Sequence, residues 1–126
     1  MTRDEKPFEP EFNAAVSLYQ AGDALGASNR LQALVSQFPN EAAIHGVLGG
    51  YLREAGLEDR ALPHAKVAVE LSPQRENPAR LLFHILLELK HFSEAQAELL
   101  RFLSTTSDEA LRDEWNRLLE ETDVDA

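Results

Sequence analysis

An internal repeat with a period of 34 residues constrains this chain more than any other feature of its sequence. Phe38-Pro39 and Ser72-Pro73 lie one period apart, and Thr106-Ser107 follows after the same interval. Small residues and leucines recur with that spacing too: Ala27, Ala61 and Ala95; Leu18, Leu52 and Leu86; and Gly22 and Gly56. A fixed period of this length is typical of helical hairpins that stack into a solenoid.

The period divides the chain into three repeats, at 8–41, 42–75 and 76–109. Each repeat is predicted to contain two helices, A and B, joined by a short turn. The expected helices span 10–20, 24–37, 41–54, 58–71, 78–89 and 94–105. We therefore predict an all-α fold, an α-solenoid of three antiparallel helical hairpins.

A further helix is predicted over 107–121. It has one apolar stripe, formed by Leu111, Trp115, Leu118 and Thr122, and a charged opposite face. Such a helix can cover the exposed side of the last hairpin, so we expect a C-terminal capping helix and about seven helices in all. Residues 1–7 are expected to be a flexible N-terminus, and 122–126 an acidic tail.

Local signals support the proposed helix boundaries. Gly22 and Gly56 follow the A helices, where a left-handed residue is favoured. Pro39 and Pro73 end the B helices. The predicted N-terminal caps are Asn40, Asn77 before Pro78, Ser93 in a capping box with Gln96, and Thr106 in a capping box with Glu109.

The amino-acid composition and net charge argue against some classes of function. Apolar residues make up 44% of the 126 positions, which is enough for one domain with a core. No apolar run is long enough to span a membrane, and no secretory signal is recognised, so a cytoplasmic protein is expected if residue 1 is the native start. The net charge of −10 disfavours binding to nucleic acid, and no membrane association is expected.

The sequence lacks the residue patterns of catalytic or metal sites. It has no cysteine, and its histidines, at 45, 64, 84 and 91, show no zinc-protease spacing. His84 and Glu88 lie four residues apart and could share a metal, but an ion pair is the simpler expectation. We predict no enzyme activity, no catalytic residue, no cofactor and no bound metal.

The residues quoted above resemble the tetratricopeptide repeat family over residues 8–109. The second repeat agrees best, with Leu48, Gly49, Ala61, Ala68 and Pro73 on the family's preferred types and Leu52 in place of its tyrosine. The third repeat departs most, because Phe83 occupies a position where the family has a small residue. We expect this repeat to be splayed, or repacked against Trp115.

The resemblance implies that the A helices line a concave groove. The predicted partner-binding residues are Phe12, Asn13, Val16 and Tyr19 in the first repeat, Gly46, Val47, Gly50 and Arg53 in the second, and Arg80, Leu81, His84 and Leu87 in the third. Gly46 and Gly50 would leave a bare patch for a partner; alternatively, they relieve crowding against a neighbouring helix. Val16 and Leu81 could equally belong to the interhelical core.

Some members of the family clamp a C-terminal carboxylate with lysine, arginine and asparagine at five groove positions. The matching positions here are Phe12, Val16, Val47, Asn77 and Leu81, of which only Asn77 fits. We therefore do not predict a carboxylate clamp.

The sequence as a whole predicts a non-catalytic protein–protein interaction module: a small adaptor or chaperone that holds a peptide or helix of a client protein in the groove. The alternative is a self-associating structural, assembly or immunity protein whose apparent groove is an oligomer interface. A homodimer would then form through an exposed N-terminal edge at Phe8 and Phe12.

Overall fold

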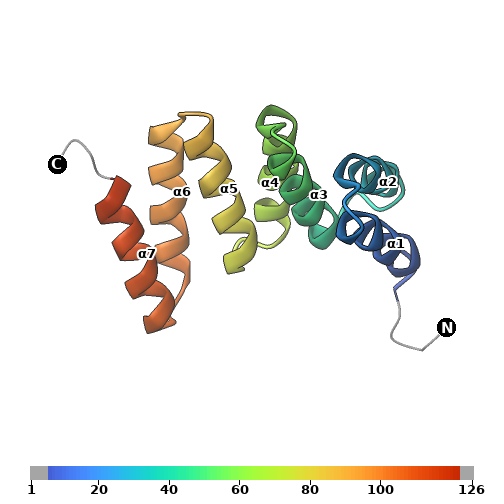
Figure 1. Ribbon diagram of the computed structural model, residues 1–126. Helices are drawn as coiled ribbons and strands as arrows, with labels where there is room; N and C mark the ends of the chain where they lie inside the picture. The colour runs from blue at the N-terminus through green and yellow to red at the C-terminus, as the bar shows by residue number, and fades with distance from the viewer. Residues whose placement is uncertain (1–5, 123–126) are drawn as a thin grey trace.

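The computed structural model of the chain describes residues 6–122 as seven α-helices, with no strand in that range. The helices are α1 (Glu9–Gln20), α2 (Ala24–Gln37), α3 (Ala42–Glu54), α4 (Glu58–Leu71), α5 (Glu76–Glu88), α6 (Phe92–Thr105) and α7 (Glu109–Thr122). The first six form three successive hairpins, and α7 packs against α6 at the C-terminal end (Figure 1). The all-α solenoid with a capping helix is confirmed.

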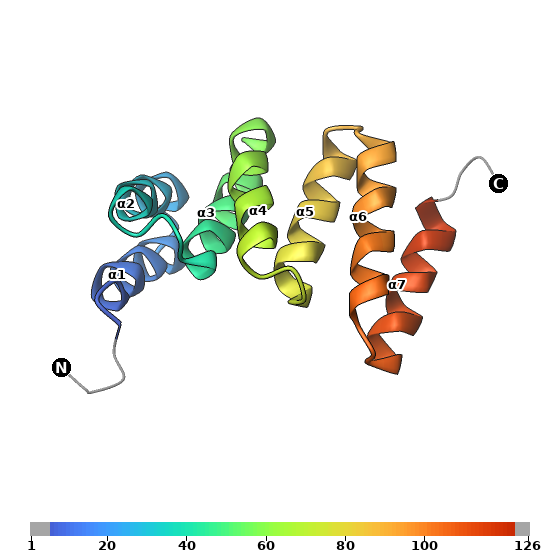
Figure 2. The same cartoon turned by 180° about the vertical axis from the view of Figure 1, so that it is seen from behind.

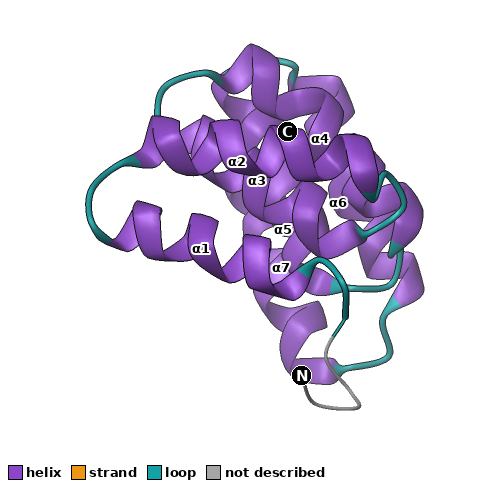
Figure 3. Cartoon of the chain, turned by 90° about the vertical axis from the view of Figure 1, so that its right-hand side faces the viewer, coloured by secondary structure: helices purple, strands orange, loops and turns teal. Residues whose placement is uncertain are grey.

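The hairpins follow one another along a curved stack, and the two helices of a hairpin lie on different sides of it. In Figure 1, α3 lies in front of α4; in Figure 2, which shows the molecule from behind, α4 lies in front of α3. Figure 3 looks from the N-terminal end of the stack and shows helices joined by short loops. We call the surface of α1, α3 and α5 the A-helix face, and that of α2, α4 and α6 the B-helix face.

Small side chains allow the helices of a hairpin to pack closely. Ala27, Ala61 and Ala95, which are related by the repeat, are each fully buried. At Gly49, an added Cβ would stand 3.2 Å from the Leu81 side chain and 3.5 Å from the Ala61 carbonyl oxygen. A larger residue there would push α3 away from both α4 and α5.

In the third hairpin, packed aromatic rings replace the small side chains. Phe83 occupies the repeat position of Gly49 and is fully buried, with its ring centroid 5.9 Å from that of Trp115. The Trp115 ring also lies 4.6 Å from that of Phe102 in α6. Of the two outcomes that the sequence left open for this repeat, splaying or repacking against Trp115, the structure shows the repacking, and it attaches α7 to the stack.

The turn within each hairpin needs one left-handed residue. Gly22 and Gly56 have φ angles of 94° and 78°, as their positions predicted. In the third hairpin the same repeat position is Lys90, with a φ angle of 63°. The sequence analysis missed this residue, because lysine gives no signal for a left-handed turn.

The predicted N-terminal caps at Asn40, Asn77 and Ser93 are wrong. The N-cap residues of α3, α5 and α6 are Glu41, Arg75 and His91, and none of their side chains bonds the first helical turn. The reason is a shift of one or two residues in where these helices begin. Asn77 and Ser93 therefore lie inside the first turn, where their side chains cannot cap it.

Two other caps do form. The Asp108 carboxylate accepts hydrogen bonds from the backbone N–H groups of Ala110, at 2.9 Å, and Leu111, at 3.2 Å, so Asp108 and not the predicted Thr106 caps α7. At the start of α2, the Asp23 carboxylate accepts the Gly26 N–H at 2.8 Å, a cap that the sequence analysis overlooked.

The N-terminal end of the stack is covered by its own side chains. Phe8 is only 6% exposed, and its ring centroid lies 6.0 Å from those of both Phe12 and Phe38. The predicted exposed apolar edge at Phe8 and Phe12 is therefore wrong. Most of the predicted flexible N-terminus and acidic tail, at 1–5 and 123–126, lies outside the described residues. Between residues 6 and 122, no helix is both long and apolar enough to cross a membrane.

Candidate partner-binding surface

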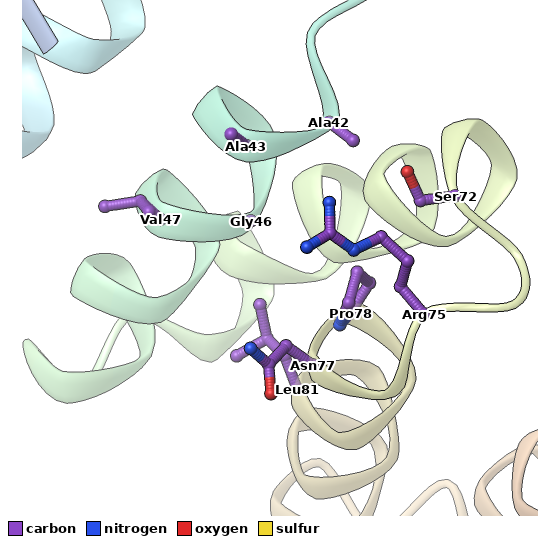
Figure 4. Close-up of a pocket in the computed structure, with 9 residues that line it drawn as sticks. All are labelled: Ala42, Ala43, Gly46, Val47, Ser72, Arg75, Asn77, Pro78 and Leu81. Carbon is purple, nitrogen blue, oxygen red and sulfur yellow. The ribbon is translucent and has the colours of Figure 1, made fainter.

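A pocket of about 350 Å³ opens between α3 and α5 on the A-helix face (Figure 4). The first two turns of α3 and of α5 form its walls, and the connection between α4 and α5 closes one edge. The lining residues are Ala42, Ala43, Gly46, Val47, Ser72, Arg75, Asn77, Pro78 and Leu81. The structure thus brings three of the predicted site residues together here: Gly46, Val47 and Leu81.

The glycines of α3 differ in what surrounds them. A Cβ added to Gly46 or Gly50 would meet no atom within 4 Å, whereas one added to Gly49 meets Leu81 and α4. Crowding therefore explains Gly49 but not Gly46 or Gly50. Because alanine would fit at both open positions and stabilise the helix by about 1 kcal/mol, packing does not account for glycine there.

A second group of predicted residues lies towards the N-terminal end of the face. Tyr19 of α1 stacks on Tyr51 of α3, with ring centroids 4.0 Å apart and planes inclined by 4°. Burial raises the pKa of the Tyr51 hydroxyl. The sequence analysis missed Tyr51, because the family positions used to find groove residues do not include it. Val16 is half-buried on the same helix as Tyr19, and Asn13 is exposed.

The third group is charged, and its arginines already have partners within the chain. The Arg53 Nε–H of α3 donates to the Glu88 carboxylate of α5 at 2.7 Å. Arg80 pairs with Glu76 in its own helix and, at 2.9 Å, with Glu114 of α7. The Arg80 guanidinium also lies 5.5 Å from the Trp115 ring centroid. Arg80 therefore helps to hold α7 in place.

His84 lies among these charges. Burial lowers the pKa of the His84 imidazole, and the positive charges of Arg53 and Arg80 lower it further, although Glu88 opposes them. The ion pair expected between His84 and Glu88 is not what forms, because Glu88 bonds Arg53 instead. A neutral imidazole near pH 7 can donate or accept a hydrogen bond on this surface. Leu87, one turn further along α5, is half-buried against the core.

The predicted residues thus fall into separate groups along the A-helix face. Phe12 belongs to none of them, because it packs against Phe8. The pocket residues that sequence reasoning did not select include Ser72, Arg75 and Pro78. Ser72 and Arg75 lie in the connection between two repeats, which an analysis of helix A positions does not reach.

The described residues contain no cluster of side chains large enough to coordinate a metal ion. Residues 6–122 contain no group of three or more histidine, cysteine, aspartate or glutamate side chains placed to hold an ion. What the A-helix face offers is an apolar pocket, open helix backbone at Gly46 and Gly50, aromatic rings and hydrogen-bonding groups. These groups are suited to noncovalent binding of a peptide.

Comparison of the fold with solved structures gives clear neighbours. The type III secretion translocator chaperone SycD of Yersinia enterocolitica superposes with a TM-score of 0.83 at 18% identity, over 99% of this chain and 88% of that chain. PcrH in complex with the chaperone-binding region of PopD gives a TM-score of 0.80 at 20% identity, over 97% and 96%. The TPR2B domain of yeast Sti1 in complex with an Hsp70 peptide gives 0.79 at 12%, over 94% and 97%.

Sequence comparison adds nothing to this assignment, because no family model matches the chain and no curated protein matches it. What the neighbours show is the fold: three helical hairpins and a capping helix, arranged as in tetratricopeptide-like repeat structures.

Proposed function

We propose that this protein is a non-catalytic client-binding module, an adaptor or chaperone that holds a peptide or helix of another protein on its A-helix face. One observation carries the proposal. Gly46 and Gly50 leave the surface of α3 uncovered beside an apolar pocket, and no packing contact among residues 6–122 explains them. An uncovered helix surface lets a partner's backbone or side chain approach closely.

The structural neighbours support this function. SycD has been crystallised with a peptide of the translocator YopD, PcrH with the chaperone-binding region of PopD, and the Sti1 domain with an Hsp70 peptide. At 12–20% identity these likenesses extend to the fold, so peptide binding by this chain is a proposal. The cytoplasmic location expected from the sequence stays a prediction.

The test is a pull-down from a lysate of the source cells with the wild type beside Gly46→Gln and Gly50→Arg. Both substitutions add a side chain to open space, and each removes a helical glycine, so the variants should be about as stable as the wild type or more so. Loss of the captured partner would then reflect a blocked surface and not unfolding, which circular dichroism checks.

The matched control is Ala97→Gln, which adds a side chain at an exposed position of α6 on the B-helix face. It should retain the partner. A partner kept by both glycine variants but lost by Ala97→Gln would move the binding surface to the B-helix face and contradict the proposal.

Self-association remains the second candidate, now at a different surface. Among residues 6–122, four large apolar side chains are exposed, Leu25 by 55%, Leu71 by 39%, Phe92 by 61% and Leu100 by 49%, and all of them belong to α2, α4 or α6. SycD has also been described in an alternative dimer. Light scattering over a range of concentrations tests this candidate. A dimer that Phe92→Ser dissociates would support it, and a monomer at every concentration would eliminate it.

A further inference from the structure

The pocket between α3 and α5 is apolar except along one edge. Its apolar wall consists of Ala42, Ala43, Gly46, Val47, Pro78 and Leu81. Ser72, Arg75 and Asn77 supply the polar edge, and none of the nine lining residues is acidic. The chain has a net charge of −10, whereas the residues that line this pocket carry one positive charge and no negative charge.

Arg75 is the only charged residue that lines this pocket. Figure 4 shows its side chain running from the connection between α4 and α5 towards α3. Arg75 is exposed and, within residues 6–122, forms no ion pair. Its neighbour Glu76 is already paired with Arg80. Arg75 therefore differs from Arg53 and Arg80, whose charges are neutralised by partners in the chain.

The helix ends at the pocket carry the same sign of charge. Ala42 and Ala43 begin α3, and Asn77 and Pro78 lie in the first turn of α5. Neither helix has a capping side chain on its first turn. Each of these helix ends carries an acid, Glu41 before α3 and Glu76 in α5, but Glu76 is paired with Arg80 and Glu41 lies 4.0 Å from Lys6. Neither acid lines the pocket, so Arg75 supplies its charge.

From this charge complementarity we propose that the pocket receives an apolar side chain of a client peptide in which an aspartate or glutamate lies beside that side chain and pairs with Arg75. The proposal rests on the proposed function and names the chemistry of the client at this point. A volume of about 350 Å³ is small for a binding pocket, so it suits a side chain with its adjoining backbone and not a folded partner. The planar guanidinium of Arg75 can bond both oxygens of a carboxylate.

The first experiment pans a displayed library of random peptides against the full chain as wild type and as Arg75→Gln. The wild type should enrich peptides that place aspartate or glutamate next to leucine, methionine or phenylalanine. Arg75→Gln should enrich the same apolar residues without the acid. Arg60→Gln is the matched control, because Arg60 is also exposed but lies on α4 away from the pocket; it should give the wild-type profile.

The second experiment measures affinity by fluorescence anisotropy with the most enriched peptide. Arg75→Gln should bind roughly two- to fivefold more weakly, the range expected for one exposed charge pair. Added salt should reduce this difference, since exposed pairs are screened. Arg75→Glu should bind poorly to the acidic peptide and should recover when the peptide's acid is replaced by lysine.

The outcomes separate this proposal from the function on which it rests. Two results would overturn the proposal for the pocket. In the first, Arg75→Gln enriches acidic peptides as strongly as the wild type does. In the second, the wild type enriches peptides that show no preference for an acid. If those peptides were still lost on Gly50→Arg, client binding on the A-helix face would stand. If the wild type enriched no peptide at all, both proposals would fail.

Discussion

Two histidines meet inside the second hairpin. The Nδ1 atoms of His45 and His64 lie 3.2 Å apart, and His45 Nε2 lies 2.7 Å from the carbonyl oxygen of Pro39. A carbonyl only accepts, so His45 Nε2–H donates to it; with both rings neutral, His64 Nδ1–H then donates to His45 Nδ1. The same repeat positions in the first hairpin are Glu11 and Arg30, which form an ion pair at 3.6 Å.

The histidine pair predicts that acid destabilises the fold. Burial lowers the pKa of His64, and the charges of His45 and Arg60 lower it further. The unfolded chain then binds protons more readily than the folded one, so the free energy of unfolding should fall as pH drops below about 6.5. The slope for one histidine is at most about 1.4 kcal/mol per pH unit. His84, whose pKa is also lowered, adds to the same trend.

Urea unfolding at a series of pH values measures this dependence. His64→Gln should flatten the slope, while His91→Gln, at an exposed position, should leave it unchanged. A wild-type protein whose stability is level from about pH 7.5 to 5.5, or rises on acidification, would show that the lowered histidine pKa values do not control stability.

Lys90 provides a second prediction at the residue scale. Its φ angle of 63° is unfavourable for a residue with a Cβ atom, whereas Gly22 and Gly56 adopt the equivalent conformation without strain. Lys90→Gly should raise the free energy of unfolding by about 0.5–1 kcal/mol, because relief of strain outweighs the greater freedom of glycine in the unfolded chain. Chemical denaturation measures the change.

Lys66→Gly is the control for Lys90→Gly. It removes an exposed lysine from within α4, where glycine should cost about 1 kcal/mol. The two variants should therefore change stability in opposite directions. Equal destabilisation by both would mean that the turn at Lys90 is not left-handed in solution.

At the scale of the element, α4 contains an unfavourable residue. Pro63 lies inside this helix and is exposed. It has no N–H to donate to the Asp59 carbonyl, and its ring crowds that carbonyl. Pro63→Ala should stabilise the protein by about 1–3 kcal/mol. Thermal melts followed by circular dichroism measure the gain.

Pro78→Ala serves as the comparison for Pro63→Ala. Pro78 is in the first turn of α5, where an N–H would have no helical partner, so its replacement should change stability by less than about 0.5 kcal/mol. A Pro63→Ala variant that is no more stable than Pro78→Ala would show that α4 accommodates its proline without loss.

At the scale of the whole molecule, α7 is attached to the stack by the buried Trp115, by the half-buried Leu111, Leu118 and Leu119, and by the pairing of Glu114 with Arg80. Trp115 is the only fully buried residue of the helix, and its indole N–H has no hydrogen-bond partner within the described residues. Its contribution is therefore packing against Phe83 and Phe102. Trp115→Ala should cost about 3–5 kcal/mol.

A single hairpin cannot bury enough apolar surface to fold alone. The stability lost on Trp115→Ala should therefore lower the unfolding temperature of all three hairpins together. Tyr19 and Tyr51 stack at the other end of the molecule, and near-ultraviolet circular dichroism can follow them. In the wild type and in Trp115→Ala, this signal and the far-ultraviolet signal should have the same melting temperature. That temperature should be lower in Trp115→Ala. Asn116→Ala, an exposed neighbour in α7, should leave the melt unchanged. A tyrosine signal that keeps its wild-type midpoint would show that the hairpins unfold independently.

The sequence by itself determined the repeat, the number of helices and the position, Phe83, at which the third repeat departs from the pattern. These follow from periodicity, because stacked hairpins place every residue in one of a few recurring environments. The left-handed turns at Gly22 and Gly56 were predictable for the same reason. The predicted caps failed because helix ends depend on how each repeat meets the next, and a shift of one residue changes which side chain can reach the backbone.

Only the tertiary structure decided what the A-helix face presents. The family resemblance placed Arg53 and Arg80 on it, but the structure pairs both with acids from other helices. It also showed that Gly49 is packed while Gly46 and Gly50 are open, although all three lie on one helix. Arg75 lines the pocket from the connection between two repeats, outside the helix A positions from which the groove residues were predicted. Pairing, open space and pockets arise between elements that are distant in the chain, so a local pattern cannot fix them.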